Sequence, residues 1–327
     1  MVKVGMLSFA HMHANSYIQC VKQLPNAELV GIADDNAVRG KKIAKQQQTK
    51  YFPSYEKLLA EDIQAVVICS ENVYHRKLTT LAAKAGKHVI CEKPISVSVK
   101  DAQAMIDVCK QNKVQLMTAF PCRFAPPVVR VKQMIDEGKI GKIIAINGTN
   151  HGRMPGGWFI DKKLSGGGAV MDHTVHVSDL MRWMTKAEFT EVYAEIDTRF
   201  HKINIDDCGM LNMKMDNGAF TTLDPSWSRS TVYPTWGDVT MHIIGTDGVV
   251  WLDTFNQKMA LYNKDEVRPN WLYWGSNMDL EMIRAFVDAI DTNKPVPVTG
   301  YDGLKAMEVA LGAYQSAKKK APVKLPL

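Results

Sequence analysis

The chain has 327 residues, of which 46% are hydrophobic and 23% are charged, and its formal net charge at pH 7 is +6. These values are ordinary for a globular enzyme of about two domains, with ample apolar material for a core. The basic residues are scattered, and no basic stripe is interleaved with aromatic residues, so nucleic acid is excluded as an expected partner.

The positions of the cysteines and the first residues of the chain indicate the expected cellular compartment. The cysteines show no C-x-x-C spacing, and several lie in apolar runs, at positions 20, 69, 91, 109, 122 and 208. We therefore expect buried, reduced thiols and a reducing compartment. The apolar run at the start of the chain is too short for a signal sequence or a membrane span. The expectation is a cytoplasmic protein that does not contact a membrane.

The first third of the chain alternates short apolar runs with helical segments. The runs are rich in Val and Ile and nearly continuous in hydrophobicity, as in strands buried on both faces, at Val2–Leu7, Glu28–Ala33, Ala65–Cys69, His88–Cys91 and Val114–Thr118. The predicted helices between them are His11–Leu24, Ala37–Gln48, Tyr74–Ala85 and Val99–Asn112. Strict alternation predicts an α/β domain over residues 1–121, with a Rossmann-type parallel sheet and right-handed crossovers.

The pattern changes near Pro121. After a helix predicted from Pro126 to Glu137 come longer strands that alternate apolar and polar residues, at Lys142–Thr149, Thr190–Arg199, Cys208–Met215, Ala219–Asp224, Asp238–Ile244, Val249–Asp253 and Met259–Tyr262. Turns of hairpin type are predicted at 216–218 and 245–248. Further helices are predicted at Ala169–Thr185, Asp279–Asp291 and Gly303–Lys319. Residues 122–327 are thus expected to form a C-terminal α+β domain with a large, mostly antiparallel open sheet.

An open sheet with one uncovered face predicts that the protein forms oligomers. Such a face is frequently buried against a second copy of the chain, because an exposed apolar sheet surface is unfavourable in water. We therefore expect a homodimer or homotetramer that assembles through the C-terminal sheet.

The turn after the first predicted strand, Ser8 to His13, reads SFAHMH. A dinucleotide-binding fold has G-x-G-x-x-G at this register, and none of the three glycines is present. Ser8 can still form a tight turn, and Ala10 adds only a methyl group where the backbone approaches pyrophosphate. His13 is bulky at the place where a helix packs close to a strand. We expect the pyrophosphate at the start of the following helix, near the backbone amides of Phe9–Met12.

The second predicted strand ends in two acids, Asp34 and Asp35. An acid at this point can accept hydrogen bonds from both ribose hydroxyls of adenosine, and it repels a 2′-phosphate. No arginine immediately follows, so NAD is the expected cofactor and NADP is less favoured. The alternative interpretation is that these acids only cap the next helix.

Several motifs resemble one family. Residues 86–94 read GKHVICEKP, and the Glu92-Lys93-Pro94 that follows the strand resembles a motif of the Gfo/Idh/MocA (glucose–fructose oxidoreductase, inositol dehydrogenase, rhizopine catabolism) family. Other residues resemble that family in chain order, namely Asn72, His75, Arg123, Phe124, Pro126, Gly166, Gly167, Gly168, Asp172, His176, Ser226 and Trp227. The resemblance covers essentially the whole chain. It implies NAD or NADP, a sugar or polyol substrate, hydride transfer, and a cis bond between Lys93 and Pro94.

Three residues are predicted to be catalytic. Lys93 follows the predicted strand His88–Cys91, beside the expected nicotinamide, where its ammonium could hold the reacting hydroxyl and stabilise negative charge. Asp172 and His176 are four residues apart on one predicted helix and share a face. His176 is the expected general base, because histidine titrates near neutral pH, and Asp172 would orient the substrate. Metal binding by these two with His173 is not expected, because residues 172 and 173 would point apart.

The wider site is predicted from the same strand ends and loops. The residues expected to bind the cofactor are Ser8, Phe9, Ala10, His11, Asp34, Ser70, Asn72, His75, Glu92, Lys93 and Arg123. The residues expected to bind the substrate are Lys93, His151, Trp158, Asp172, His173 and His176. Aromatic side chains in two further loops also suit a sugar ring, at Tyr233, Trp236, Trp271, Tyr273 and Trp274.

The function predicted from these residues is that of an NAD-dependent dehydrogenase. It would oxidise a secondary hydroxyl of a sugar, polyol or related carbohydrate by hydride transfer to nicotinamide. Two alternatives remain open at this point. The first is a non-catalytic sensor of NAD or sugar, which the altered phosphate loop favours. The second is oxidation-assisted glycoside cleavage on the same fold, in which the cofactor is reduced and reoxidised within one cycle.

Overall fold

The structure, a computed structural model, describes residues 1–256, 258–261, 270–273 and 275–327. The side chains of Trp271, Tyr273 and Trp274, which the sequence suggested for a sugar site, lie outside the described part. The chain divides into two compact units, Met1–Pro121 with Asp279–Leu304, and Cys122–Met278 with Lys305–Leu327.

The first unit contains one segment that we had assigned to the second domain. Residues 279–304 group with the N-terminal unit, so the expected division into 1–121 and 122–327 is wrong for this segment. The Ser16 hydroxyl donates to Asp279 (2.5 Å), and Met117 pairs with Thr299 beside the last strand of the sheet. The segment therefore joins the first unit by adding to the open edge of its sheet, a contact far apart in sequence.

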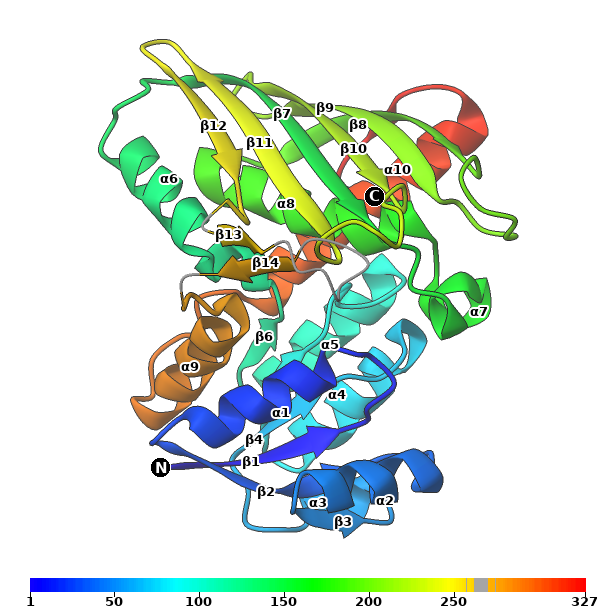
Figure 1. Cartoon of the computed structure of the whole chain (residues 1–327), viewed down its shortest axis with the longest axis vertical. Coiled ribbons are helices and arrows are strands. Elements are labelled where there is room, and N and C mark those ends of the chain that lie inside the picture. The colour runs from blue at the N-terminus through cyan, green and yellow to red at the C-terminus, as the bar shows by residue number, and fades with distance from the viewer. Residues whose placement is uncertain (257, 262–269, 274) are drawn as a thin grey trace. The chain divides into compact units, whose positions relative to one another are not determined.

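The first unit is a parallel sheet of six strands in the order β3-β2-β1-β4-β5-β6 (Figure 1). The strands are β1 Val2–Leu7, β2 Ala27–Ala33, β3 Lys50–Phe52, β4 Ala65–Ile68, β5 His88–Cys91 and β6 Leu116–Thr118. The helices are α1 Ala14–Gln23, α2 Ala37–Gln46, α3 Tyr55–Leu59, α4 His75–Lys84, α5 Val99–Gln111 and α9 Met278–Asp291, with a 3-10 turn η1 at Asn72–Tyr74. This confirms the predicted Rossmann-type sheet. The sequence missed β3 and α3, which are too short to display a hydrophobic period.

The second unit is built on a sheet of seven strands in the order β12-β11-β7-β10-β9-β8-β15. The strands are β7 Ile143–Gly152, β8 Phe189–Asp197, β9 Cys208–Met215, β10 Phe220–Ser226, β11 Gly237–Gly245, β12 Val249–Asp253 and β15 Val323–Lys324. β10 runs parallel to β7, and the other pairs are antiparallel, which confirms the predicted mostly antiparallel sheet. Both predicted hairpin turns are present, because β9 pairs with β10 and β11 with β12.

Helices, 3-10 turns and a separate pair of strands complete the second unit. They are α6 Pro126–Asp136, α7 Lys162–Ser165, α8 Ala169–Thr185 and α10 Gly300–Lys319, the 3-10 turns η2 Pro121–Phe124 and η3 Gly157–Ile160, and a separate pair of strands, β13 Lys258–Leu261 and β14 Asn270–Tyr273. Helix α8 lies across one face of the sheet (Figure 1).

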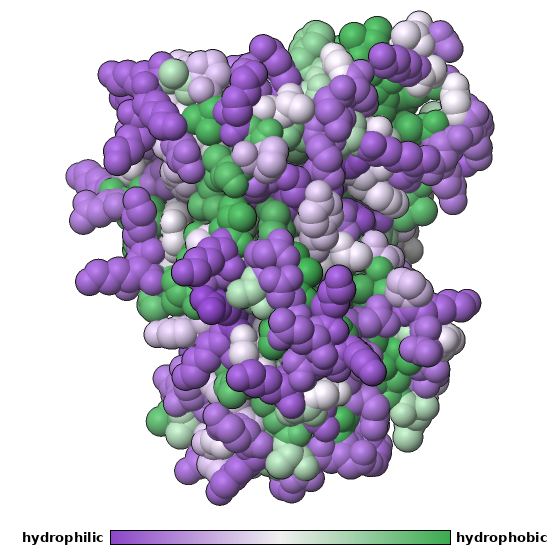
Figure 2. All heavy atoms as spheres, turned by 180° about the vertical axis from the view of Figure 1, so that it is seen from behind, coloured by the Kyte–Doolittle hydropathy of each residue, from purple (hydrophilic) through white to green (hydrophobic). Residues whose placement is uncertain are grey.

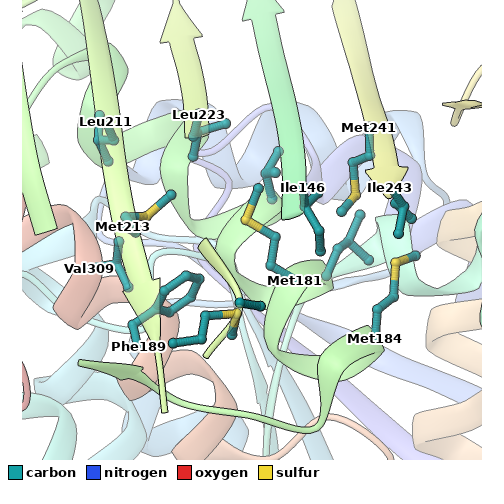
Figure 3. Close-up of a cluster of buried hydrophobic side chains, with 14 of the residues drawn as sticks. Ile146, Met181, Met184, Phe189, Leu211, Met213, Leu223, Met241, Ile243 and Val309 are labelled. Carbon is teal, nitrogen blue, oxygen red and sulfur yellow. The ribbon is translucent and has the colours of Figure 1, made fainter. Parts of the chain in front are cut away.

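The core of the second unit lies between α8 and the covered face of the sheet (Figure 3). Met181 and Met184 of α8 belong to one cluster with side chains of the sheet, among them Leu223. Gly148 of β7 allows this approach, since a Cβ there would lie 2.6 Å from Val177. Alternation along each strand then sends the neighbouring side chains to the opposite face.

That opposite face is apolar in places and exposed. Trp251 is 79% exposed, and Phe220, Met210 and Val249 are also exposed on this face. Figure 2 shows one side of the molecule, where hydrophilic residues dominate and hydrophobic residues form separate groups between them. Among the described residues, none of the helices has the length and hydropathy needed to cross a bilayer.

Candidate functional site

The turn between β1 and α1 keeps the backbone form of a glycine turn without the glycines. Ser8 has φ 69°, the left-handed conformation that glycine adopts freely and that costs another residue about 1–2 kcal/mol. Two hydrogen bonds hold it there. Its N–H donates to the Ala33 carbonyl (2.8 Å), and its hydroxyl accepts from the Ala10 N–H (3.3 Å). The expectation that Ser8 forms the tight turn is confirmed.

Several backbone amides of this turn already have acceptors within the protein. The Phe9 N–H donates to Asp34 Oδ2 (2.8 Å), the His11 N–H to the Cys69 carbonyl (2.9 Å), and the His13 N–H to His11 Nδ1 (3.2 Å). The first turn of α1 carries no acidic residue, and no side chain caps its N-terminus. The helix end therefore suits an anion, as a dinucleotide phosphate requires, whereas the amides of Phe9 and His11 are engaged elsewhere.

Asp34, at the end of β2, is saturated with donors. Besides the Phe9 amide, its carboxylate accepts from the Asn36 N–H (2.8 Å) and from Arg39 through Nε (2.8 Å) and Nη2 (2.7 Å). The cap of α2 is Asn36, whose side chain accepts from the Arg39 N–H. Asp34 therefore does not cap the helix. The sequence interpretation overlooked Arg39, which lies one helical turn beyond the acids and folds back onto them.

The loops after β4 and β5 meet around His75. Its ring nitrogens lie 2.9 Å from the Pro94 carbonyl oxygen and 3.2 Å from that of Ser70. The imidazole thus joins the two loops and holds in place the turn that contains Lys93, which is 4% exposed. The Lys93–Pro94 bond is cis, as the resemblance implied. Asn72, in η1, is buried in the same region.

A buried carboxylate, Glu92, lies at the end of β5 and gathers two histidines. Its Oε1 is 2.9 Å from His13 Nδ1, its Oε2 is 3.9 Å from His11 Nε2, and Oε2 also accepts from the Lys93 N–H (2.9 Å). The three side chains offer ligand atoms within 4.8 Å of one another, the one such group among the described residues. His11 Nδ1 accepts a backbone N–H, so in the neutral ring Nε2 carries the hydrogen. That tautomer suits a hydrogen-bonded network and not metal coordination through Nε2.

The charges of this network are mutually dependent. Burial alone would raise the pKa of Glu92, but its interactions with the imidazoles of His11 and His13 lower it well below its usual range. Burial opposes a charge on His13, yet the Glu92 carboxylate raises the pKa of His13 above its ordinary value. The arrangement therefore favours an ionised Glu92 beside an imidazolium at His13.

In the second unit, α8 begins where three glycines allow other segments to cap it. Asp206 accepts from the Gly168 N–H and the Val170 N–H (2.9 Å each), and the Tyr314 hydroxyl accepts from the Gly168 N–H (3.1 Å). A Cβ at Gly168 would collide with the Asp206 backbone, and one at Gly167 with Tyr314. Gly167 and Gly168 are thus required by close approach, and neither cap was found from the sequence, because both come from distant segments.

Asp172 is held by two neighbours. Its Oδ2 accepts from Trp227 Nε1 (3.1 Å) and lies 3.2 Å from His173 Nε2. His173 Nδ1 in turn is 2.9 Å from the Asn150 carbonyl oxygen. The argument that residues 172 and 173 point apart was wrong, because the long side chains meet beside the helix. The result is an Asp–His pair fastened to β7.

His176, one turn further along α8, is buried beside Cys122, whose Sγ is 4.0 Å from its Nδ1. Arg123 makes a bidentate pair with Asp179 (Nε to Oδ2 2.6 Å, Nη2 to Oδ1 2.5 Å), and both side chains are buried. This pair attaches η2 to α8 next to His176. Arg123, which we expected to bind the cofactor, is thus placed to support the helix.

His151 is not brought together with the α8 residues, whereas Trp158 packs against a cluster that includes Ala169 of α8. His151 alternates with Asn150 on β7 and lies on the face of the sheet opposite α8, between Asp224 (Nε2 to Oδ2 3.0 Å) and Asp238 (Nδ1 to Oδ1 3.2 Å). Trp158 stacks on Phe159 (ring centroids 3.9 Å apart) and packs against a small apolar cluster that contains Trp227. In the structure His151 thus forms an ion-pair bridge between two aspartates, and Trp158 packs in this apolar cluster.

Comparison with known proteins agrees with this architecture. The family model described as oxidoreductase family, NAD-binding Rossmann fold, matches residues 2–120, and the GFO/IDH/MocA C-terminal domain matches residues 128–251. A protein of Bacillus subtilis (strain 168) named uncharacterized oxidoreductase YrbE is 30% identical over 94% of this chain and 92% of its own length. The chain belongs to the Gfo/Idh/MocA family.

Other Gfo/Idh/MocA relatives have named activities. The myo-inositol 2-dehydrogenase of Thermotoga maritima is 27% identical over 98% of this chain and 97% of its own. A solved structure of a putative myo-inositol dehydrogenase from Sinorhizobium meliloti 1021 is 26% identical, with a TM-score of 0.86 and complete coverage of both chains. GenD2 from gentamicin A biosynthesis, solved in complex with NAD, has a TM-score of 0.91 over 100% of this chain and 97% of its own at 23% identity, which shows the shared fold.

Membership in the Gfo/Idh/MocA family makes this chain an NAD-binding oxidoreductase. The residues of the first unit fit that cofactor at the start of α1. Asp34 lies at the end of β2, where the ribose is expected, but its carboxylate already accepts four hydrogen bonds within the protein. They depart from the usual dinucleotide site in the loop, where His13 and Ala10 stand at glycine positions.

The His151 bridge predicts a stability that depends on pH. Burial disfavours the charged ring, but hydrogen bonds to Asp224 and Asp238 raise the pKa of His151 to about 9. With an unfolded value of about 6.5, the stabilisation is complete below that pH and lost as the pH rises towards 9, a change on the order of 2–3 kcal/mol. His151→Gln should therefore lower the melting temperature by several degrees at pH 6 and by little at pH 9.5.

The matched control is His242→Gln, since His242 lies on β11 of the same sheet and stacks on Trp251. Its melting temperature should follow the wild-type pH dependence. If the melting temperatures of wild type and His151→Gln differ by the same amount at pH 6 and at pH 9.5, the prediction that His151 is charged is contradicted.

Proposed function

We propose that this protein is an NAD-dependent dehydrogenase that oxidises a secondary hydroxyl of a sugar, polyol or inositol-like ring. The observation that carries the proposal is the buried Lys93 at the end of β5, in the NAD-binding unit and beside an ionisable carboxylate. The names of relatives, among them inositol 2-dehydrogenases from several bacteria, support a polyhydroxylated ring as the substrate class.

Lys93 is proposed to hold the reacting hydroxyl. NAD, when bound, supplies the hydride acceptor. The Lys93 ammonium can donate to the hydroxyl oxygen and stabilise the negative charge that develops there as the proton leaves. Its burial strengthens this interaction, because little water competes for the charge.

His176 is proposed as the general base that takes the hydroxyl proton. Its Nδ1 faces Cys122, so we propose that Nε2 is the nitrogen that accepts the hydroxyl proton. The Arg123–Asp179 pair on the next turn holds this part of α8 in place. Asp172, fixed by Trp227 and His173, is proposed to orient the substrate beside the base. Asp34 is proposed to bind the adenosine ribose, and the start of α1 the pyrophosphate.

Substitution of either proposed catalytic residue should lower turnover while the fold persists. Lys93→Met should reduce oxidation by about 10²-fold, and His176→Asn by roughly 10²–10⁴-fold with nearly unchanged NAD affinity. His176→Asn should also remove the loss of rate at low pH that protonation of an imidazole base causes. The measurement is steady-state kinetics over a pH series, with a panel of inositols, sugars and polyols.

Lys139→Met is a control for the loss of a lysine, because Lys139 forms an exposed ion pair with Glu137. It should leave turnover on the best substrate of the panel within a few-fold of wild type. Turnover near wild type in Lys93→Met would remove Lys93 from the mechanism. A retained rate and pH profile in His176→Asn would assign proton transfer to another group.

Cofactor preference should depend on Asp34 and Arg39 together. A 2′-phosphate meets the Asp34 carboxylate, and this repulsion should disfavour NADP by about 1–3 kcal/mol. Asp34→Asn removes the charge and releases Arg39, so NADP should bind at least tenfold more tightly while NAD weakens. Asp34→Asn/Arg39→Ala should lose the gain for NADP. Calorimetric titration with both cofactors measures this, and unchanged NADP affinity in Asp34→Asn would contradict the placement of the ribose.

We also infer that the exposed face of the seven-stranded sheet joins copies of this chain. Large exposed apolar side chains on β9, β10 and β12 support this, and a lone monomer would leave them in water. Trp251→Asp with Met210→Lys should therefore shift the protein to monomers in size-exclusion chromatography with light scattering. Val38→Asp, at an exposed apolar residue of α2, is the control and should not change the mass. A wild type that is monomeric at micromolar concentration would contradict the inference.

A further inference from the structure

His13 occupies an unusual place for a charged side chain. It is the residue directly before α1, where a dinucleotide fold has its third glycine, and 36% of its side chain is exposed. Nδ1 lies 2.9 Å from Glu92 Oε1, and the Tyr17 hydroxyl is 3.4 Å from the same nitrogen. A carboxylate at Nδ1 fixes the ring and favours its protonated form, which leaves Nε2–H as a second donor.

Several backbone donors of the turn around His13 are already used within the protein, which favours phosphate binding by a side chain. Its Phe9, His11 and His13 amides donate to Asp34, Cys69 and the His11 ring. In the usual glycine turn the backbone approaches the pyrophosphate and supplies such donors. Here the residue at the third glycine position brings an imidazole with a buried carboxylate behind it instead.

We propose that the His13 imidazolium, held by Glu92, binds the pyrophosphate of the dinucleotide in place of the glycine backbone. This inference rests on the proposed use of NAD and names the group that binds its phosphates. A positive ring at the start of α1 adds to the favourable end of the helix dipole, and a charge-assisted hydrogen bond to phosphate is stronger than one from a neutral donor. Affinity for NAD then depends on the protonation of one histidine.

The groups that surround His13 determine how it titrates. Glu92 at the end of β5 and Asp279 at the start of α9 favour its charged form, whereas Lys93 and burial oppose it. His11 lies beside it with ring centroids 4.3 Å apart and shares Glu92. Burial raises the pKa of Tyr17 and of Cys69 well above their usual values, so both stay neutral between pH 6 and pH 9.5. The balance leaves His13 with a raised pKa, and its charge is lost as the pH rises through that value.

The experiment measures binding by the full-length protein, with NAD, ADP-ribose and adenosine as probes in calorimetric titrations from pH 6 to pH 9.5 at constant ionic strength. NAD and ADP-ribose both carry the pyrophosphate, and their dissociation constants should rise about tenfold as His13 loses its charge. Adenosine carries no phosphate, and its affinity should stay constant. Circular dichroism at each pH confirms that the fold persists.

Variants locate the effect at His13. His13→Gln keeps a polar side chain without a charge, and at pH 6 it should bind NAD about tenfold more weakly, with a flat pH profile. His13→Gly restores the usual glycine and should also give a flat profile. Glu92→Gln should move the loss of affinity to lower pH, because the carboxylate no longer favours the charged ring. His88→Gln, at the other end of β5, should retain the wild-type profile.

The outcomes separate this inference from the proposed function. If His13→Gln binds NAD with wild-type affinity and pH dependence, the role of His13 is overturned while NAD use stands. If adenosine shows the same pH dependence as NAD, the effect does not come from phosphate and the inference fails. If the folded wild type binds neither NAD nor ADP-ribose at millimolar concentration, the proposed function fails and the role of His13 fails with it.

Discussion

The buried carboxylate of Glu92 is the constraint on which the first unit depends. A charge without water is unfavourable by several kcal/mol unless neighbours compensate it, so the chain must supply donors around it. It does so with the Lys93 amide from the same turn and with two imidazoles from the turn after β1. The Glu92 carboxylate therefore connects the loops that follow β1 and β5. Both loops lie at the carboxyl ends of the strands, where this fold binds its cofactor.

The same constraint accounts for the altered glycine turn. Glycines permit close approach of backbone to pyrophosphate, and their replacement by Ser8, Ala10 and His13 changes how the turn is held together. Ser8 keeps the left-handed backbone, with its hydroxyl bonded within the turn. Two of the amides donate to Asp34 and Cys69. The turn is fixed before any ligand binds, which reduces the conformational entropy that binding must overcome.

In the second unit, a single helix carries the side chains proposed for catalysis. Asp172, His173, His176 and Asp179 follow one another on α8; Asp172 accepts from Trp227, His173 contacts β7, and both His176 and Asp179 contact η2. The caps from Asp206 and Tyr314 hold the first turn, and the core beneath Met181 and Met184 holds the helix against the sheet. A rigid helix anchored at several points can keep a base and its neighbours at constant spacing, which acid–base catalysis requires.

The sequence by itself determined the parts of this protein that depend on local physics. Hydrophobic periods located nearly all the strands and helices, and turn residues located both hairpins. Local motifs also led to the roles proposed for Lys93, Asp172 and His176. Only the tertiary structure decided the partners. It showed that Arg39 covers Asp34, that Arg123 pairs with Asp179, that His151 lies on the face away from α8, and that residues 279–304 join the first unit. Most of these depend on contacts between segments far apart in the chain, or on a long side chain that turns back over its own helix. A local sequence pattern determines which face of a helix or strand a residue occupies. It does not determine which charged side chain from a distant segment will contact that residue in the folded protein.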